Sequence, residues 1–358
     1  MQTIPGTVGN PWLGVLIFTL GGLAGALFYL PLKKIRNWAW ESYWMVYAIS
    51  GLLVVPWLLA FATSPNVLQV LSRAPAREVA YCFVCGAIWG FGGLTFGLMI
   101  RYLGVGLGLA LGLGLTSATG TLIPPMLKGQ AAIAAMYTTS SGLVSVAAAV
   151  VSLAGIVFVG LAGRSKEREL PEKQKKQTVA EFNFKKGILV AIFSGLTSSG
   201  MNFGLQGGTH IQSLALSTPP ATSITWSGAP VLCVVLLGGF VVNAGWCLIL
   251  NVKNMTGGDY VNRRDPLRRN FMLAIAAGAI WCAQFVCLKT GEPRMGRTAY
   301  LGWAVLMASS ILFSQLFGLW LGEWTGTSRR TVRLLLTGLA VLFASVGLAG
   351  YSGYITAG

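Results

Sequence analysis

The chain has 358 residues, of which 54% are hydrophobic and only 10% carry a charged side chain. Soluble domains carry about 25% charged residues, so this chain could not cover the surface of a soluble fold with polar groups. The composition excludes a soluble globular protein and predicts an integral membrane protein. The net charge of +16 must therefore be compatible with a protein that lies mostly in the membrane.

Apolar stretches long enough for transmembrane helices follow one another along the chain. A helix needs about 20 residues to cross a hydrocarbon core about 30 Å thick, and these stretches do not alternate between apolar and polar residues as β-barrel strands would. The sequence therefore predicts an all-α integral membrane protein with ten transmembrane helices. They are expected at 12–32, 42–62, 79–100, 103–127, 137–162, 186–207, 227–250, 271–290, 298–321 and 332–354.

The basic residues lie mainly in every second connecting loop. The loops after odd-numbered stretches hold 20 of the 26 Lys and Arg residues. Because such residues concentrate in cytoplasmic loops, these loops are predicted to face the cytoplasm and both termini the opposite side. Residues 28–44, FYLPLKKIRNWAWESYW, then form the cytoplasmic exit of the first helix, with tryptophans at headgroup depth and cations against anionic lipid. The net charge is thus that of a membrane protein, and no nucleic-acid partner is predicted.

The beginning of the chain lacks the pattern of a cleaved secretory signal peptide. No Lys or Arg precedes Lys33, so the basic region of a secretory signal peptide is missing and the first helix is expected to be retained.

The most polar segment, GRSKERELPEKQKKQTVAEFNFK at 163–185, lies near the middle of the chain. Five predicted spans precede it and five follow, and an odd number per half makes the second half enter the membrane in the opposite sense. This is the inverted-repeat plan of many secondary transporters. The predicted organisation is a five-helix repeat at 1–162, a charged cytoplasmic linker at 163–185 and a second five-helix repeat at 186–358.

Amides and aromatic rings inside the predicted spans are the candidates for a substrate site. A polar group in hydrocarbon costs several kcal/mol unless it is paired. Each amide is therefore expected to bond either a substrate or a neighbouring helix. Each aromatic ring is expected to bind a substrate, to pack against another helix or to anchor at the membrane interface. Amides suit sugar hydroxyls and indoles suit apolar C–H faces, which favours a neutral polar solute. The candidate substrate-binding residues are Tyr29, Trp89, Asn202, Asn243, Gln284 and Trp303.

No acidic residue lies at the centre of a predicted span, although a proton-coupled carrier needs a titratable group near the membrane. Three residues are candidates for this role: Glu41, Glu323 and His210. Glu41 could instead pair with Lys33 or Lys34. The six cysteines lie inside spans and are expected to be free thiols. No catalytic motif occurs, so neither an enzyme, a metal site nor a cofactor is predicted.

Four stretches carry a resemblance to a known family. They are FYLPLKKIRNWAWESYW, GAIWGFGGLTFGLMIRYLGVGLGLALGLGLT, EFNFKKGILVAIFSGLTSSGM and LGEWTGTSRR, and together with weaker matches they cover nearly all of the chain. They resemble the bacterial L-rhamnose–proton symporter family of the drug/metabolite transporter superfamily. Family patterns fall on Phe28, Tyr29, Pro31, Lys33, Lys34, Trp38, Trp40, Glu41, Arg101, Tyr102, Leu103, Gly104, Phe182, Asn183, Lys185, Lys186 and Gly187, and also on Asn243, Gln284 and Trp303.

The chain departs from the family pattern at Asn202, where the family has a smaller, serine-like residue, and in the loop around His210. Both departures leave the exact sugar open. The resemblance implies two inverted five-helix repeats and uptake of L-rhamnose with protons across the bacterial inner membrane. With it, the sequence predicts a secondary active transporter that imports L-rhamnose or a close deoxy-sugar by alternating access, with H+ preferred over Na+ as the coupling ion.

Two alternatives stay open: an exporter of drugs or metabolites from the same superfamily, and a membrane sugar sensor that binds without transporting.

Overall fold

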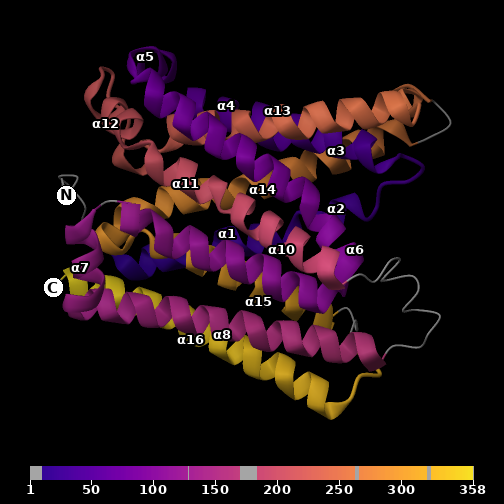
Figure 1. Ribbon diagram of the computed structural model, residues 1–358. Coiled ribbons are helices and arrows are strands. Elements are labelled where there is room, and N and C mark those ends of the chain that lie inside the picture. The colour runs from indigo at the N-terminus through magenta and orange to yellow at the C-terminus, as the bar shows by residue number, and fades with distance from the viewer. Residues whose placement is uncertain (1–9, 128, 170–183, 263–265, 321–323, 358) are drawn as a thin grey trace. The chain divides into compact units, whose positions relative to one another are not determined.

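The computed structural model describes residues 10–127, 129–169, 184–262, 266–320 and 324–357, most of which are helical, and no strand occurs among them (Figure 1). This confirms the predicted all-helical class. Within the described residues, nine segments are long and apolar enough to cross a membrane. They are Pro11–Leu32, Trp40–Thr63, Ala76–Phe96, Ser140–Lys166, Lys185–Ser217, Ile224–Lys253, Leu267–Met295, Leu301–Trp320 and Arg329–Ser352.

The predicted span at 103–127 belongs to α6 (Ala76–Leu127), a helix of 52 residues. If α6 were straight it would be about 78 Å long, more than twice the thickness of a hydrocarbon core. Met99 and Leu111 nevertheless share one apolar cluster, and the thioether of Met99 lies against Gly112. Such contacts require the chain to turn back within α6. These are the contacts expected of two membrane crossings that are joined by a turn within α6. The tenth transmembrane span remains a prediction.

The helices pack into two compact units, each assembled from separate parts of the chain. Unit 1 comprises Met1–Leu23, Gly92–Asn202 and Gly291–Gly358, and unit 2 comprises Ala24–Phe91 and Phe203–Thr290. Each unit therefore combines helices from before and after the polar segment at 163–185. This grouping reflects packing rather than internal repetition, so the predicted inverted repeats at 1–162 and 186–358 remain a prediction.

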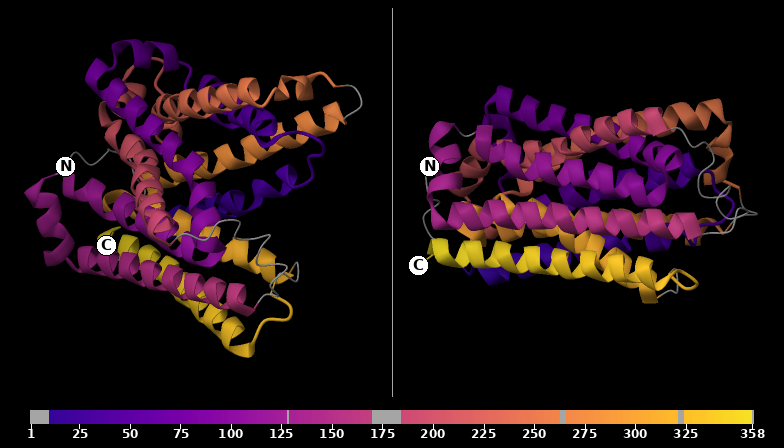
Figure 2. Two further views of the ribbon diagram at one scale, coloured as in Figure 1. Left: turned by 45° about the vertical axis from the view of Figure 1, so that its right-hand side comes forward. Right: turned by 60° about the horizontal axis from the view of Figure 1, so that its bottom comes forward.

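Unit 1 is dominated by two long antiparallel helices, α8 (Ser140–Glu169) and α16 (Arg329–Ala357), which lie side by side in all three views (Figures 1 and 2). The hydroxyls of Ser145 and Ser352 are 2.6 Å apart near one end, and Glu169 contacts Ser328 at the other. The other elements are parts of α1 (Pro11–Leu27), α6 and α14 (Leu267–Met295), with α7 (Gln130–Thr138), α10 (Phe184–Ser198), η4 (Gly296–Thr298) and α15 (Leu301–Trp320).

Unit 2 is built around α13 (Ala229–Lys253), which packs against the second predicted span. That span contains a π-helical turn, η1 (Ile49–Val54), between α3 (Trp40–Ala48) and α4 (Val55–Thr63). Close packing depends on glycine: Gly86 lies against the carbonyl of Val235, where a Cβ would overlap it. The remaining elements are α2 (Tyr29–Leu32), α5 (Val67–Arg73), α12 (Thr209–Ser217), η2 (Ile224–Trp226), η3 (Thr256–Tyr260) and parts of α1, α6, α14 and α11 (Gly200–Gly207), whose first three residues belong to unit 1.

Loops that the charge pattern assigns to the same side of the membrane contact each other within the units. In unit 2, the amide of Asn270 donates to the carbonyl of Arg36 at 2.8 Å. The opposite end of the unit brings Ser64 within 2.7 Å of Thr222. These pairs agree with the predicted topology, whose orientation remains a prediction.

One local expectation was wrong. His210, expected in a loop, lies in α12, which follows α10 and α11 after breaks at Ser199 and Gly208.

The cysteines behave as predicted: all six are free thiols, and five of them are buried.

Candidate functional site

The six predicted substrate-binding residues divide between the two units. Tyr29, Trp89, Asn243 and Gln284 belong to unit 2, whereas Asn202 and Trp303 belong to unit 1. Each group is described by itself.

In unit 2 an aromatic cluster joins four segments of the chain. Trp89 of α6 stacks on Trp281 of α14 with ring centroids 5.2 Å apart. Trp281 in turn meets Tyr47 edge-on at 6.1 Å, and Tyr47 lies 4.6 Å from Trp44. Contacts of this kind stabilise by about 0.5–1.5 kcal/mol each beyond their burial. The cluster comprises Phe28, Tyr29, Trp40, Trp44, Tyr47, Trp89, Trp281 and Phe285.

Asn243 supports this aromatic cluster. Its Oδ1 accepts a hydrogen bond from Nε1 of Trp44 at 3.0 Å, and its Nδ2 donates to the carbonyl of Gly239 at 2.9 Å. The two bonds fix the orientation of the amide, because only the NH2 group can donate to a carbonyl. Asn243 therefore bonds a neighbouring helix, which is the alternative to substrate binding that the sequence left open.

Gln284 is the contrasting amide of unit 2. It lies almost one helical turn after Trp281 in α14 and is only 5% exposed. Within the described part of the chain, its amide has no hydrogen-bond partner. An enclosed amide with unused donors and acceptor, next to stacked indoles, has the chemistry to bind a hydroxyl-bearing ligand.

In unit 1, Asn202 and Trp303 meet at one turn of α6. Asn202 donates from Nδ2 to the carbonyl of Gly120, and Trp303 donates from Nε1 to the carbonyl of Thr116 at 3.2 Å. The indole of Trp303 also lies against Gly120, where a Cβ would overlap it. Oδ1 of Asn202 and the hydroxyl of Thr121 are buried without a partner among the described residues. Each such unmet group costs about 1–3 kcal/mol, so this turn has unused capacity for a hydroxyl or a water.

Glu41 is enclosed, at 5% exposure, whereas the side chain of His210 is 72% exposed. Its Oε1 accepts hydrogen bonds from Asn254 at 2.9 Å and from Thr256 at 3.0 Å. Among the described residues, then, an amide and a hydroxyl hold this carboxylate, rather than Lys33 or Lys34.

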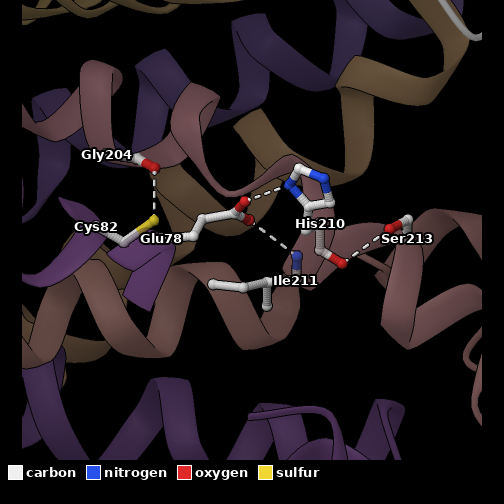
Figure 3. Close-up of polar contacts among 6 residues, drawn as sticks. All are labelled: Glu78, Cys82, Gly204, His210, Ile211 and Ser213. Carbon is white, nitrogen blue, oxygen red and sulfur yellow. Dashed lines mark hydrogen bonds and ion pairs between the residues drawn. The ribbon is translucent and has the colours of Figure 1, made fainter. Parts of the chain in front are cut away.

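Figure 3 shows the polar contacts of His210, which belongs to unit 2. Its Nδ1 lies 2.7 Å from Oε2 of Glu78, whose Oε1 accepts the backbone N–H of Ile211 at 2.9 Å. The histidine side chain is 72% exposed and the glutamate 11%. The pair fastens the start of α12 to α6. Glu323, the third candidate, lies outside the described residues.

Sequence reasoning missed two residues that the structure makes prominent. Trp44 lies between Trp40 and Tyr47 and is fixed by Asn243, yet nothing in its sequence neighbourhood distinguishes it from the other tryptophans. Asp259 lies in η3, in a polar loop, and reaches the start of α3. Its partners are more than 200 residues away in sequence, so only the fold reveals its role.

Comparison with known proteins gives a consistent result. The model of the family described as L-rhamnose-proton symport protein (RhaT) matches residues 10–353. The L-rhamnose-proton symporter of Cronobacter sakazakii (strain ATCC BAA-894) is 31% identical over 344 residues, covering 94% of this chain and 96% of the relative. Those of Klebsiella pneumoniae (strain 342) and Escherichia coli O1:K1 / APEC are 30% identical, each covering 94% of this chain and 97% of the relative.

Proposed function

This chain belongs to the L-rhamnose-proton symport protein family, and from that premise we propose that it imports L-rhamnose, or a close deoxy-sugar, together with protons by alternating access. It is a multi-pass membrane protein, and the bacterial inner membrane is its proposed location. The related proteins are named for both the sugar and the proton, which supports H+ over Na+ as the coupling ion.

The observation that carries the sugar assignment is the unpaired amide of Gln284 beside the stacked Trp89 and Trp281. A deoxy-sugar presents hydroxyls, which an amide can bind, and apolar C–H and methyl groups, which suit an indole face. The proposed substrate-binding residues of unit 2 are thus Gln284 and Trp89, with Asn243 and Tyr29 supporting the aromatic cluster. Asn202 and Trp303 of unit 1 remain proposed substrate-binding residues.

Alternating access requires parts of the protein to move relative to one another. The chain passes from one unit to the other four times, each time inside a helix: after Leu23, Phe91, Asn202 and Thr290. A glycine lies within two residues of each passage, at Gly22, Gly92, Gly204 and Gly291. Few residues are needed to absorb a hinge rotation, and we place the hinges of the transport cycle at these glycines.

Coupling to a proton supplies the driving force. One charge moving through about 100 mV is worth about 2.3 kcal/mol, roughly a fifty-fold accumulation of a neutral sugar. Glu41 is the proposed proton carrier because it is an enclosed carboxylate at the start of a membrane helix.

The direct test is counterflow of labelled L-rhamnose in proteoliposomes that contain the purified protein. The wild-type protein should exchange the sugar, and Gln284→Ala should raise the half-saturation concentration about two- to tenfold, the effect of one hydrogen bond to a neutral group. Gln212→Ala is the matched control, because that amide already bonds Ser227 at 2.9 Å. An unchanged half-saturation in Gln284→Ala would refute the site. Binding without counterflow would favour the sensor, and export of amphipathic drugs would favour the exporter.

A further inference from the structure

Five exposed basic residues of unit 2 are brought to its predicted cytoplasmic end from two distant segments of the chain. Lys33, Lys34 and Arg36 belong to the loop between α2 and α3, and Arg268 and Arg269 to the first turn of α14. We call these five residues the basic platform. Like charges repel one another, so the fold must hold these two segments together.

One buried amide joins the two segments. Asn270 of α14 is fully buried. Its Nδ2 donates to the carbonyl of Arg36 at 2.8 Å, and its Oδ1 accepts the backbone N–H of the same residue at 3.3 Å. Arg268 and Arg269 directly precede Asn270 in the chain. The two hydrogen bonds therefore fix Arg36 close to the two arginines of α14, although 234 positions separate Arg36 from Asn270.

The loop that carries Arg36 is also held on its other side. Oδ2 of Asp259 accepts the backbone N–H of Ala39 at 2.8 Å. Trp38 is buried and meets Phe271 of α14 edge-on, with ring centroids 4.9 Å apart. The backbone is thus fixed before and after the exposed cation, and a ligand of the platform would not have to order this loop when it binds.

The charges of the platform are available to a ligand. Within the described part of the chain, four of the five side chains, all except that of Lys33, make no ion pair and no hydrogen bond. The two nearby carboxylates, Glu41 and Asp259, accept hydrogen bonds from other groups. A cluster of unpaired cations favours an anionic ligand.

The surface of α14 that follows the platform is apolar and exposed. Arg268, Met272 and Ile275 lie on one face of the helix, because they are spaced by four and three residues. Met272 is 60% exposed and Ile275 48%. A hollow of about 510 Å³ lies along the start of this helix, and Arg269, Met272 and Leu273 are among the residues that line it. Along this face, a cation is followed within about one turn by apolar surface at the start of a membrane-spanning segment.

We infer that the basic platform binds an anionic phospholipid of the leaflet predicted to be cytoplasmic. Its phosphate pairs with the arginine guanidiniums, which match phosphate geometry with two parallel hydrogen bonds. Its acyl chains cover Met272 and Ile275. A soluble anion would use the cations but leave the apolar face uncovered, and an uncharged lipid would do the reverse. An anionic phospholipid matches both parts of the surface.

The first test uses native mass spectrometry of the purified full-length protein to measure the dissociation constant of the first bound lipid. The probe is phosphatidylglycerol, and the reference is phosphatidylethanolamine with the same acyl chains but no net charge. Wild type should prefer phosphatidylglycerol at least about tenfold, because each nearby cation contributes about fivefold. Equal affinity for the two lipids would overturn the inference. Displacement of phosphatidylglycerol by equimolar glycerol 3-phosphate would show a site for a soluble anion, and would also overturn it.

The second test removes charge from the platform. Arg268→Gln/Arg269→Gln should raise the dissociation constant for phosphatidylglycerol roughly thirtyfold, since two cations are lost. Arg329→Gln/Arg330→Gln is the matched control, because it removes the same charge from two exposed residues at the start of α16. The control should change the constant less than about twofold, since its residues are not part of the platform. Equal weakening in both double variants would show attraction to net charge alone and would contradict the site.

The third test keeps every charge and removes the two bonds that position Arg36. Asn270→Ala should raise the dissociation constant about fivefold, the share of one cation. Unchanged binding would show that the fold does not assemble the platform, and would overturn the inference. Thermal unfolding without added lipid shows whether the variant is folded. If Asn270→Ala does not fold, Arg268→Gln/Arg269→Gln decides alone, because its exposed side chains leave the interior intact.

Discussion

The bond between Asn243 and Trp44 separates two roles for Asn243 that the sequence could not distinguish. If Asn243 acts by orienting the indole, then Asn243→Ala and Trp44→Phe disturb the same contact. Asn243→Ala removes the acceptor of a 3.0 Å bond from Trp44 Nε1 and also a 2.9 Å bond to Gly239. Trp44→Phe keeps an aromatic ring but removes the indole N–H.

The expected magnitude follows from that single shared bond. Each single variant loses the net contribution of this hydrogen bond, about 0.5–1.5 kcal/mol. The donor or acceptor that remains without its partner adds a further penalty where it is buried. The double variant loses the bond only once. The double-mutant cycle for L-rhamnose binding should therefore give a coupling energy of about 1 kcal/mol, or roughly fivefold in affinity.

Calorimetric titration of the purified wild type, the two single variants and the double variant with L-rhamnose measures this coupling. Thermal unfolding of the same four proteins separates an effect on binding from a loss of fold. Purely additive effects on affinity would contradict the positioning role and would indicate that Asn243 binds the sugar independently of Trp44.

Three further predictions concern other parts of the chain. Gly120→Ala should weaken sugar binding and lower thermal stability, because its methyl group would overlap the Trp303 indole; unchanged binding would remove this turn from the site. Hydroxyls of Ser328 and Thr331 and the N–H of Ser328 lower the pKa of Glu169 from 4.5 to about 2. The stabilisation from Glu169 is therefore present above about pH 4.5 and lost as pH falls toward 2. The melting temperature of wild type should exceed that of Glu169→Gln by a small, constant amount at neutral pH, and the difference should vanish in that acidic range; a difference that grows there would contradict the assignment. His210→Ala should leave proton-driven accumulation nearly unchanged, since the His210 side chain is 72% exposed and a contact of this kind contributes only about 0–1 kcal/mol, and loss of accumulation with counterflow intact would make His210 the coupling residue.

Much of the fold follows from local properties of the sequence. The predicted span at 227–250 corresponds to α13, Ala229–Lys253, because a long apolar run has few alternatives to a membrane helix. The break in the sixth span was harder to predict. Ser199 interrupts the predicted span at 186–207, yet a serine inside an apolar run carries no local sign of a break. The second break, at Gly208, coincides with the predicted end of that span.

The candidate site depends on contacts that local sequence cannot encode. The list of polar residues inside spans correctly drew attention to Gln284 and Asn243, but it could not show that one amide is unpaired and the other is bonded to an indole 199 positions away. Asp259 escaped notice for the same reason, because its role depends on Ser42, which lies 217 positions away.

The measurement that tests the account most directly is the change in external pH when L-rhamnose is added to proteoliposomes that contain the wild-type protein. The account predicts that sugar entry makes the external medium more alkaline, in sodium-free buffer, and that the change is lost in Glu41→Gln. Sugar entry that needs sodium and leaves the external pH constant would contradict it.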